Sequence, residues 1–303
     1  MQDTGPCPKV AVVLSTYNGE RYLEQQLDSI LGQDHENLHI FIRDDGSTDG
    51  TLDILERYEE RDQITLIRGE NIGVTGSFLE CVKKVPQDVP YIALSDQDDV
   101  WHLDKIARAV DQLKGVDSQT PALYCSERNY CDADLSDPVA SRLNRKGNSF
   151  ALSLFDNVCP GNTIVMNRFL ADRLLQCDAD DMYYHDWWLE LLATCFGQVI
   201  YDPEPTVEYR RLDESVSPSG KRGVALLIFR IKEYLAESKM EDVSRQLIRF
   251  FERFGDEMSE QDREVLQLFV SDSRMKKLFF PKRLRQTLGG EVQLRLCFLM
   301  GLL

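Results

Sequence analysis

The sequence lacks the features that mark several large classes of protein. No stretch approaches the roughly 20 consecutive apolar residues that a membrane-spanning helix requires. Residues 1–10 contain no basic start followed by an apolar run, so we expect no secretory signal. Basic residues are also scarce: 35 Lys and Arg stand against 51 Asp and Glu, and the net charge of −16 disfavours wrapping of nucleic acid. We therefore expect a cytoplasmic protein that binds no nucleic acid.

The eight cysteines show no CxxC spacing, which is the usual sign of a zinc or redox site. Most of them lie in apolar segments such as 123–125. A free cysteine in such a segment behaves as a small hydrophobic residue, and disulfides are rare in the cytosol. We expect buried, reduced thiols rather than disulfides or zinc ligands.

The first 115 residues alternate between two hydrophobic periods. Short apolar runs at 9–15, 38–43, 64–68 and 90–95 predict strands, and each is followed by a segment with helical spacing. Strands that alternate with helices of this length predict βαβ units and a mostly parallel sheet. The predicted helices span residues 20–31, 49–61, 75–85 and 101–114.

The rest of the chain divides into a mixed part and a helical part. Strand and helix patterns mix up to about residue 215, whereas the pattern after Gly223 is helical throughout. The polar stretch 215–220 is the best candidate for a boundary. The predicted strands here are 122–126, 163–167, 199–201 and 206–209, and the predicted helices 183–196, 226–237, 243–254, 260–269 and 293–303. The predicted domains are an α/β domain at 1–215, with halves at 9–115 and 116–215, and a helical C-terminal extension at 216–303.

Three carboxylates, at Asp96, Asp98 and Asp99, follow the apolar strand 90–95 directly. Carboxylates this close repel one another, and carboxylate oxygens suit a divalent cation such as Mg²⁺ or Mn²⁺. In an extended strand Asp96 and Asp98 point the same way and can share one ion, which substrate phosphates usually help to hold. The alternative is a turn in which Asp98 or Asp99 caps a helix over 100–113. We favour the metal, because a cap does not require three acids.

Polar stretches also follow the first two predicted strands. Asp44 and Asp45 precede a cluster at 47–49 that suits a helix cap; either acid can instead accept hydrogen bonds from a base or a ribose. Residues 16–20 form a turn in which Glu20 opens the next helix, or line a nucleotide pocket. Ligands of parallel sheets bind beyond the carboxyl ends of the strands. We therefore expect these loops and the acidic loop to meet at one crevice.

A second candidate for chemistry lies at the start of the predicted helix 183–196. Asp186 is an ordinary first-turn acid there, since carboxylates suit a helix N-terminus. It is flanked by His185 and Trp187, and such a partly apolar setting can raise the pKa of a carboxyl and make it a useful base. Chemistry alone leaves the two interpretations equal.

The C-terminal end differs in charge from the rest. Residues 274–303 hold seven Lys and Arg and one acid, a net charge of +6 on a body of −22. Bases alternate here with large apolar residues such as Phe279, Phe280 and Leu284. One interpretation is a solvated helix face packed on the catalytic domain, with Lys stems covering apolar surface. The other is contact with an anionic membrane surface, into which these three apolar residues dip.

Taken together, five segments resemble the family 2 glycosyltransferases. The match runs from about residue 9 to 215, and among family members it is similar to the bacterial rhamnosyltransferase-like enzymes that build surface polysaccharides. The resemblance implies a GT-A fold, a nucleotide-diphosphate sugar donor and an inverting mechanism. The matching segments are TYNGERYL at 16–23, DDGSTDGT at 44–51, NIGVTGSF at 71–78, LSDQDDVW at 94–101 and HDWW at 185–188.

The resemblance also implies roles for single residues. Asp96 and Asp98 form the DxD element, with Asp98 the more direct metal ligand, and Asp186 matches the catalytic base. The donor side comprises Thr16, Asn18 and Glu20 around the nucleotide, Asp44 at the base or ribose, Asn71, and Trp101 and Lys105 in the segment after DxD. The acceptor side comprises Gly161, Asn162, His185 and Trp187.

One stretch departs from the family pattern. Relatives commonly carry Tyr-Arg-x-His after the last strand, but this chain has Leu212 in place of the histidine. Leucine ligates nothing, so the metal shell relies on phosphates and water, or Arg210 and Arg211 hold the diphosphate directly.

The sequence thus predicts a metal-dependent inverting glycosyltransferase. Its expected donor is dTDP-rhamnose or a UDP-sugar, and its acceptor a saccharide, lipid-linked, at the inner face of the cell membrane. A nucleotidyltransferase also uses paired acids and a divalent ion, but it needs a Gly-rich basic loop after the first strand, and residues 15–22 contain no Lys. A third possibility is an inactive scaffold subunit that only binds a nucleotide-sugar.

Overall fold

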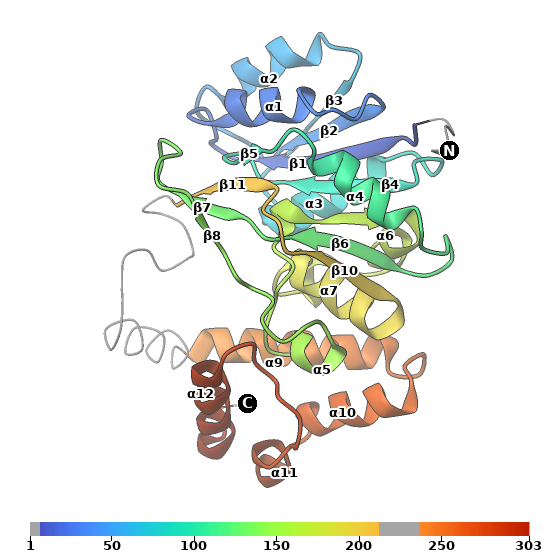
Figure 1. The fold of residues 1–303 in the computed structure, drawn as a ribbon, viewed down its shortest axis with the longest axis vertical. Helices are drawn as coiled ribbons and strands as arrows, with labels where there is room; N and C mark the ends of the chain where they lie inside the picture. Colours follow the sequence, from blue (N-terminus) through green and yellow to red (C-terminus); the bar gives the residue numbers. More distant parts are fainter. Residues whose placement is uncertain (1–6, 212–236, 303) are drawn as a thin grey trace.

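A computed structural model of the chain describes residues 7–211 and 237–302. The alternation predicted for the first 115 residues is confirmed up to the fourth strand (Figure 1). These elements are β1 (Val10–Thr16), α1 (Leu23–Leu31), β2 (Leu38–Asp44), α2 (Thr51–Glu59), β3 (Ile64–Arg68), α3 (Gly73–Lys84) and β4 (Tyr91–Ser95).

The central sheet has seven strands in the order β10-β6-β9-β4-β1-β2-β3. It is mostly parallel, as predicted; β9 (Val165–Asn167) is the antiparallel member, between β4 and β6 (Ala122–Ser126). β10 (Gln198–Asp202) extends the sheet parallel to β6. The first five residues of β1 are all buried, because helices cover both faces of the sheet at this strand. A run of apolar residues without alternation is what such a strand requires.

A second sheet of four short strands lies beside the first, in the order β5-β11-β7-β8. Its members are β5 (Val100–Trp101), β7 (Asn129–Cys131), β8 (Val139–Ala140) and β11 (Val207–Arg210). The predicted helix over 101–114 is wrong at its start: Trp101 pairs with Val207 in this sheet, and α4 (Lys105–Leu113) begins only after Asp104. A long-range strand pairing therefore overrides the local helical pattern.

Short elements connect the two sheets to the longer helix α7 (His185–Phe196). The sequence predicted α7 within two residues of its start, but it did not predict the short pieces, whose length leaves little periodicity to detect. These are α5 (Phe150–Ser153), η1 (Gly161–Thr163), α6 (Arg168–Leu174) and η2 (Ala179–Asp181).

The C-terminal extension is helical, as predicted. Its helices are α9 (Glu237–Phe254), α10 (Glu260–Val270), α11 (Arg274–Leu278) and α12 (Leu288–Met300). Phe250 and Phe254 of α9 pack around Trp188 of α7, with ring centroids 5.1 and 6.3 Å away. The extension thus shares a hydrophobic core with the α/β part. The boundary predicted at 215–220 lies outside the described residues, and so does the helix predicted over 226–237, apart from its last residue. The domain limits therefore stay a prediction.

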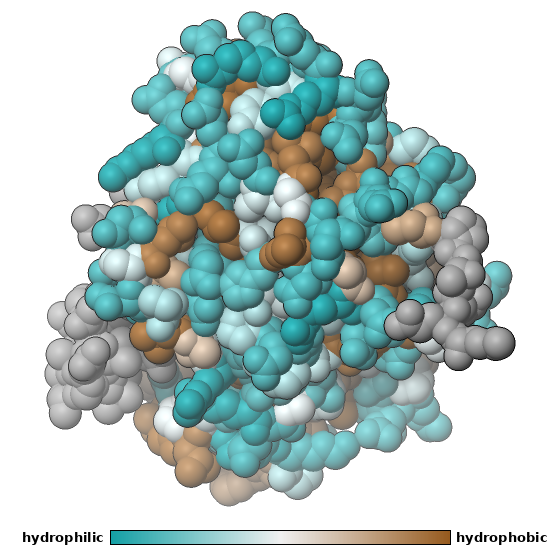
Figure 2. Space-filling model, turned by 45° about the horizontal axis from the view of Figure 1, so that its top comes forward, coloured by the Kyte–Doolittle hydropathy of each residue, from teal (hydrophilic) through white to brown (hydrophobic). Residues whose placement is uncertain are grey.

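Two expectations about composition are met within the described ranges. All eight cysteines are free, and six of them are buried. No helix in the described part of the chain is long and apolar enough to cross a membrane. The face shown in Figure 2 is mostly hydrophilic, with hydrophobic residues gathered at its lower left edge, where Figure 1 places α12.

Candidate active site

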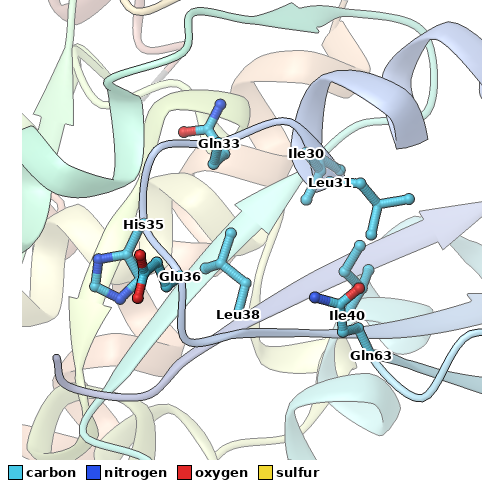
Figure 3. A pocket seen from close by; sticks show the side chains of 8 residues that line it. All are labelled: Ile30, Leu31, Gln33, His35, Glu36, Leu38, Ile40 and Gln63. Atoms are coloured by element: carbon cyan, nitrogen blue, oxygen red, sulfur yellow. The ribbon is translucent and has the colours of Figure 1, made fainter.

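A small cavity lies at the edge of the sheet where β2 and β3 begin (Figure 3). It has a volume of about 90 Å³ and is lined by side chains that include Ile30, Gln33 and Leu38. Pockets for cofactors and substrates usually have a volume of about 300–1,000 Å³. This cavity is therefore too small for a nucleotide-sugar, and it lies at the opposite end of the strands from the predicted loops.

At the carboxyl edge, the loop after β1 is joined to the loop after β2 by direct hydrogen bonds. The backbone N–H of Asn18 donates to Ser47 Oγ (2.9 Å), and Asn18 Oδ1 accepts from the N–H of Thr48 (2.8 Å). Glu20 Oε2 accepts from the N–H of Gly50 (2.6 Å). Asn18 and Glu20, predicted to frame a nucleotide, thus hold the frame of the crevice together with their side chains.

The acidic loop after β4 joins the same frame through Gln97. Its side chain accepts from the N–H of Tyr17 (2.9 Å) and donates to the carbonyl of Tyr17 (3.1 Å). A Cβ at Gly19 would lie 2.4 Å from Gln97 Oε1, so any larger residue here would displace the Gln97 side chain. The three loops therefore meet, as predicted. Gln97 was not among the predicted residues, although it stands between the acids of the DxD segment.

Asp44 is buried, and hydrogen bonds within the protein occupy its carboxylate. Oδ1 accepts from the hydroxyls of Thr16 (3.1 Å) and Ser47, and Oδ2 accepts from the N–H groups of Gly46 (3.1 Å) and Ser47 (2.9 Å). A carboxylate offers about four acceptor positions, and all four are used here. Asp44 and Thr16 therefore shape the loop, and a base or ribose contact by Asp44 requires one of these bonds to be exchanged.

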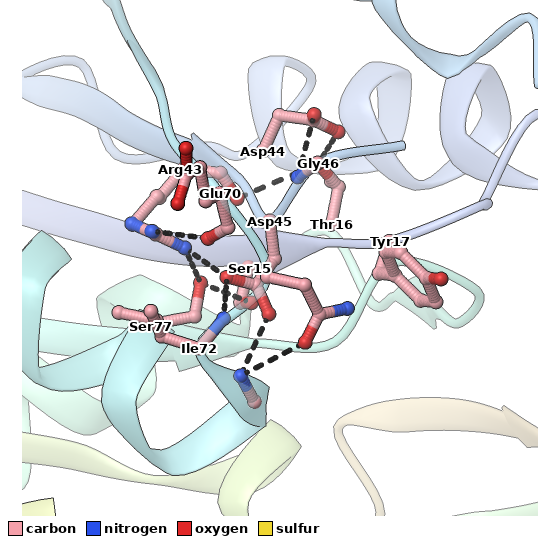
Figure 4. A network of polar contacts seen from close by, with 12 residues as sticks. Ser15, Thr16, Tyr17, Arg43, Asp44, Asp45, Gly46, Glu70, Ile72 and Ser77 are labelled. Carbon is pink, nitrogen blue, oxygen red and sulfur yellow. Dashed lines mark hydrogen bonds and ion pairs between the residues drawn. The ribbon is translucent and has the colours of Figure 1, made fainter. Parts of the chain in front are cut away.

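Asp45 lies in a buried ion pair at the same edge (Figure 4). It pairs with Arg43 and accepts from the N–H groups of Ile72 (2.9 Å) and Gly73 (2.9 Å). These bonds draw in the segment before α3, where the predicted donor residue Asn71 is exposed and accepts from the N–H of Gly73 (3.2 Å). Asn71 is thus exposed on the segment that Asp45 holds, and its contact with the sugar donor stays a prediction.

The carboxylates of Asp96 and Asp98 have no hydrogen-bond donor from any other described residue, in contrast to those after β2. Burial raises the pKa of Asp96 to about 7, with further contributions from the charges of Asp98 and Asp186. Burial also raises the pKa of Asp98, against the opposing charge of Arg210. β4 ends at Ser95, so the two acids lie in the bend after the strand and not within an extended strand, as was predicted.

Asp99 is not a helix cap, which corrects the expectation that it or Asp98 caps a helix over 100–113. It is fully buried, and Oδ2 accepts from the side-chain amide of Asn162. Its Oδ1 has no hydrogen-bond partner among the described residues. Burial, followed by the charges of Asp96 and Asp98, raises the pKa of Asp99 well above the usual range. The three acids thus form one cluster in which the charges of Asp96 and Asp98 each raise the pKa of a neighbour.

Arg210 binds the backbone of this loop. Its guanidinium donates to the carbonyls of Asp98 (2.5 Å) and Asp99 (3.4 Å), and its side chain is 2% exposed. This burial corrects the expectation that Arg210 holds a diphosphate directly, because its remaining N–H groups donate to the carbonyl of Ala133 (3.1 Å) and to the side chain of Gln25. Arg211 is exposed, with its guanidinium 4.0 Å above the ring of Tyr130, and stays available. Leu212, the departure from the family pattern, lies outside the described residues.

Lys105 is likewise not a surface residue, which corrects its predicted donor contact. Its side chain is fully buried, with Nζ 4.1 Å from the ring centroid of Trp101 and 3.4 Å from the carbonyl of Thr163. Burial lowers the pKa of Lys105 to about 7, and the charge of Asp99 opposes this shift. Lys105 and Trp101 therefore pack together in the interior, where the charge of Asp99 acts on Lys105.

The short helix η1 connects the acidic loop to Asp186. Asn162 donates to Asp99 and accepts from Arg128 Nη1 (3.2 Å), while the N–H of Gly161 donates to Asp186 Oδ2 (3.1 Å). Two neighbouring residues thus position two acids. Arg128, which follows β6 and contributes a positive charge near Asp96, was missed by the sequence. Its only sequence signal is a polar residue directly after a strand.

Asp186 lies at the first turn of α7, half-buried, and its Oδ1 accepts from the N–H of Trp187 (2.7 Å). Its neighbour His185 is buried against Phe78, with ring centroids 4.3 Å apart, and both ring nitrogens lack partners. Burial lowers the pKa of His185, which keeps the ring neutral. Trp187 Nε1 donates to the carbonyl of Ser153 (2.5 Å). Both residues thus flank Asp186, but only Asp186 presents a charged group.

The two carboxylates after β4 could bind a divalent cation if a bound substrate supplied the remaining metal ligands. In the parts of the chain that the structure describes, no group of three or more His, Cys, Asp or Glu residues has the arrangement of a metal site. Asp96 and Asp98 are two carboxylates without donors, which is the number that a Mg²⁺ site usually takes from protein when phosphates supply the rest. The protein residues therefore suit a metal–diphosphate complex better than a metal alone.

Three comparisons identify the family. Residues 11–175, more than half of the chain, match the family described as Glycosyl transferase family 2. The dTDP-rhamnosyl transferase RfbG of Shigella flexneri is 32% identical over 218 residues, which are 65% of this chain and 71% of that protein. Two solved structures share the fold at low sequence identity. TarS 1–349 of S. aureus, in complex with UDP-GlcNAc, has a TM-score of 0.55 at 15% identity and covers 97% of this chain and 92% of its own. The mannosyltransferase PcManGT from Pyrobaculum calidifontis, in complex with GDP-Man and Mn²⁺, has a TM-score of 0.57 at 18% identity, with coverages of 96% and 75%.

These likenesses establish the GT-A fold that the sequence motifs implied. The family match and the identity to RfbG together establish more than the fold. The chain is a glycosyltransferase and belongs to glycosyl transferase family 2.

Proposed function

We propose that this enzyme transfers a sugar, with inversion, from a nucleotide diphosphate to a saccharide acceptor in bacterial surface polysaccharide synthesis. One observation carries the proposal. The carboxylates of Asp96 and Asp98 accept no hydrogen bond from any other described residue, and they lie close to the charge of Asp186. The similarity to RfbG, a dTDP-rhamnosyl transferase, favours dTDP-rhamnose as the donor, and the UDP-GlcNAc complex of TarS keeps a UDP-sugar as the alternative. The acceptor is proposed to be lipid-linked.

Asp98 and Asp96 would hold Mg²⁺ or Mn²⁺ together with the diphosphate. When bound, the ion supplies positive charge to the leaving diphosphate, whose negative charge grows as the glycosidic bond breaks. The complex of PcManGT with GDP-Man and Mn²⁺ supports this choice of ion. Arg211 is exposed and follows Arg210, which binds the acidic loop, and it is the proposed further cation for the diphosphate.

Asp186 is the proposed general base. Its carboxylate takes the proton of the acceptor hydroxyl while that oxygen attacks the anomeric carbon, and the bond from this carbon to the diphosphate oxygen breaks. The electron pair of that bond leaves with the nucleotide diphosphate. One displacement inverts the anomeric configuration and needs no enzyme nucleophile, so a single carboxylate on the acceptor side is sufficient.

The remaining predicted residues are assigned supporting roles in this proposal. Gly161 orients Asp186 through its N–H, and Asn162 orients Asp99. His185 and Trp187 form the acceptor side of the crevice around Asp186. Asn71 contacts the donor from the rim, and Thr16, Asn18, Glu20 and Asp44 keep the donor side in shape.

Two alternative functions, a nucleotidyltransferase and an inactive scaffold subunit, are treated differently. Membership of a glycosyltransferase family removes the nucleotidyltransferase. An inactive scaffold subunit would bind the donor and never consume it, so turnover separates it from the proposal.

The test is a thermal-shift screen of the full chain with dTDP-rhamnose, UDP-GlcNAc and GDP-mannose, each with and without Mn²⁺. A ligand that binds only the native state raises the melting temperature. We expect one nucleotide-sugar to do so in a metal-dependent manner, and its consumption with a saccharide acceptor to give a product of inverted anomeric configuration by NMR. If no nucleotide-sugar shifts the melt, the proposal fails.

The base is tested with Asp186→Asn against Asp180→Asn, the same change at an exposed acid in η2. We expect Asp186→Asn to bind the donor normally and to lose transfer by about 10²–10⁴-fold, the usual contribution of a general base. Asp180→Asn should keep full activity. Normal transfer by Asp186→Asn would assign the base elsewhere.

A further inference from the structure

Helix α12 is apolar on two sides, and the core accounts for only one of them. Its inner side places Phe298 against Phe155 and Phe269, with ring centroids 5.6 Å away in both cases. Its outer side exposes a stripe at helical spacing, and each of these side chains is at least 50% exposed. The stripe consists of Leu288, Val292, Leu296, Leu299 and Met300. A helix that is apolar all round is normally covered on both sides.

The stripe is part of a larger concentration of exposed apolar side chains. Seven of the 14 large hydrophobic side chains that are exposed in the described residues lie between 275 and 300. Scattered exposed hydrophobic residues are normal, but a contiguous group marks an interaction site. The exposed Phe279, which follows α11, joins the stripe because Arg295 of α12 donates to the carbonyls of Lys277 and Leu278 (both 2.8 Å). We call the stripe together with Phe279 the outer apolar face.

Positive charge borders this face. Arg295 also donates to the carbonyl of Lys282 (2.9 Å), which brings Lys282 to the middle of α12, and Arg274 lies against Gly301 at the end of α12. Arg274, Lys276 and Lys282 are exposed, and no acid within the described ranges pairs with any of them. The one acid of residues 274–302, Glu291, accepts from two backbone N–H groups and pairs with Arg295. The border of the face is therefore cationic on a chain of net charge −16.

These charges decide between two kinds of partner. A second copy of this chain, related by a twofold axis, would place the same cations opposite one another. An anionic bilayer instead offers negative headgroups to the cations and an acyl boundary to the apolar side chains. Figure 1 shows α12 on the side toward which the parallel strands end.

We propose that α11 and α12 dock the protein on an anionic phospholipid surface, with the outer apolar face in the acyl boundary and the bordering cations at the headgroups. The inserted residues differ from those that the sequence suggested. Leu284 is fully buried, and Phe280 is half-buried against Phe269 (5.2 Å between ring centroids). Of the three predicted residues, only Phe279 is exposed.

The test uses sedimentation of the full chain with phosphatidylcholine vesicles, with and without phosphatidylglycerol, in the absence of any donor. Substitutions are preferable to truncation, because Leu294 and Phe298 of the same helix are part of the core. The apolar variant combines Val292→Gln with Leu296→Gln, and the charge variant combines Lys276→Gln with Lys282→Gln. Ile248→Gln, an exposed apolar residue on α9, is the matched control.

We expect the wild type and the control to bind anionic vesicles, with weaker binding at high salt and on neutral vesicles. Each double variant should lose binding by about tenfold or more, since two side chains each contribute about 1 kcal/mol or more. Their circular dichroism and melting temperature should match the wild type, because all four residues are exposed.

Several results would overturn the proposal. These are absence of binding by the wild type, equal binding to neutral vesicles, or unchanged binding by the apolar variant. A wild-type dimer in solution that the apolar variant dissolves, without vesicle binding, would assign the face to self-association. None of these results depends on the proposed sugar transfer, which is measured separately.

Discussion

Two acidic loops lie at the same edge of the sheet, and their carboxylates are in opposite physical states. After β2, Asp44 accepts four hydrogen bonds and Asp45 is paired with Arg43. After β4, Asp96 and Asp98 accept no hydrogen bond from any other described residue, and burial raises the pKa of both. Both segments look equally acidic in the sequence. The hydrogen bonds and the ion pair of the loop after β2 satisfy its carboxylates, whereas no positive group in the described ranges is bonded to the carboxylates of Asp96 and Asp98.

The difference separates carboxylates that stabilise a loop from carboxylates that are free to bind a ligand. A satisfied carboxylate stabilises a loop but has no free acceptor for a ligand. A buried carboxylate without partners costs stability until a cation arrives. Arg210 and Lys105 are cations close to the second loop, yet Arg210 donates to its backbone and Lys105 lies over the ring of Trp101. We therefore predict that the two loops respond oppositely to loss of charge.

The largest expected effect is on catalysis, at Asp98. We expect Asp98→Asn to reduce transfer by about 10²–10³-fold, because stabilisation of the leaving diphosphate is lost. Its melting temperature without metal should equal or exceed that of the wild type. Steady-state kinetics and a thermal melt measure both, with Asp62→Asn, an exposed acid outside the site, as the control. If Asp98→Asn unfolded, the carboxylate of Asp98 would be needed for stability, which contradicts the difference between the two loops.

The next effect is on stability, at Asp45. Asp45→Asn leaves Arg43 buried without its ionic partner, so we expect the free energy of unfolding to fall by about 3 kcal/mol. Denaturant titration measures this loss, which should be the same with and without Mn²⁺. A variant as stable as Asp62→Asn would mean that the pair contributes nothing.

A smaller effect concerns pH. The folded pKa of Asp96, about 7, lies above the ordinary value of 3.8, so the native state binds this proton more tightly than the unfolded state. Stability from this group is therefore present below pH 4 and is lost as the pH rises to about 7. Without divalent ions, Asp96→Asn should be more stable than the wild type at pH 8 and equal to it at pH 4. Thermal melts at the two pH values check this, and a difference that grows toward low pH has the wrong sign.

The smallest effect is expected at Gln97, which links the acidic loop to the loop after β1. Gln97→Ala removes two hydrogen bonds to Tyr17 and should lower the free energy of unfolding by about 1 kcal/mol. KM for the nucleotide-sugar should rise more than kcat falls. The variant loses the link between the two loops but keeps Asp96, Asp98 and Asp186. Gln63→Ala, at an exposed position, is the control. A loss of kcat alone would place Gln97 in the chemistry itself.

Regular elements could be predicted from the sequence because their signals are local. The runs that became β1, β2 and β4 are buried on both faces, and the helix predicted over 243–254 lies within α9. The start of α4 could not be predicted, because the pairing of Trp101 with Val207 joins residues more than 100 positions apart.

The sequence predicted which residues lie at the site better than it predicted their burial and hydrogen bonds. Asp96, Asp98 and Asp186 lie together as the motifs implied. Whether a carboxylate is satisfied depends on groups from other loops, such as Thr16 for Asp44, and composition does not encode that. For the same reason, Arg210 and Lys105 were assigned to the donor although both are buried. Arg128 was missed because its contact with Asn162 exists only in the fold.

The most direct test of the proposed metal site is a Mn²⁺ titration followed by electron paramagnetic resonance, with dTDP or UDP present. The wild type and Asp62→Asn should each remove one equivalent of Mn²⁺ from the free signal, and only when the nucleotide is present. Asp98→Asn should remove none while staying folded. Normal binding of Mn²⁺ by Asp98→Asn would contradict the claim that the loop after β4 holds the metal and the diphosphate.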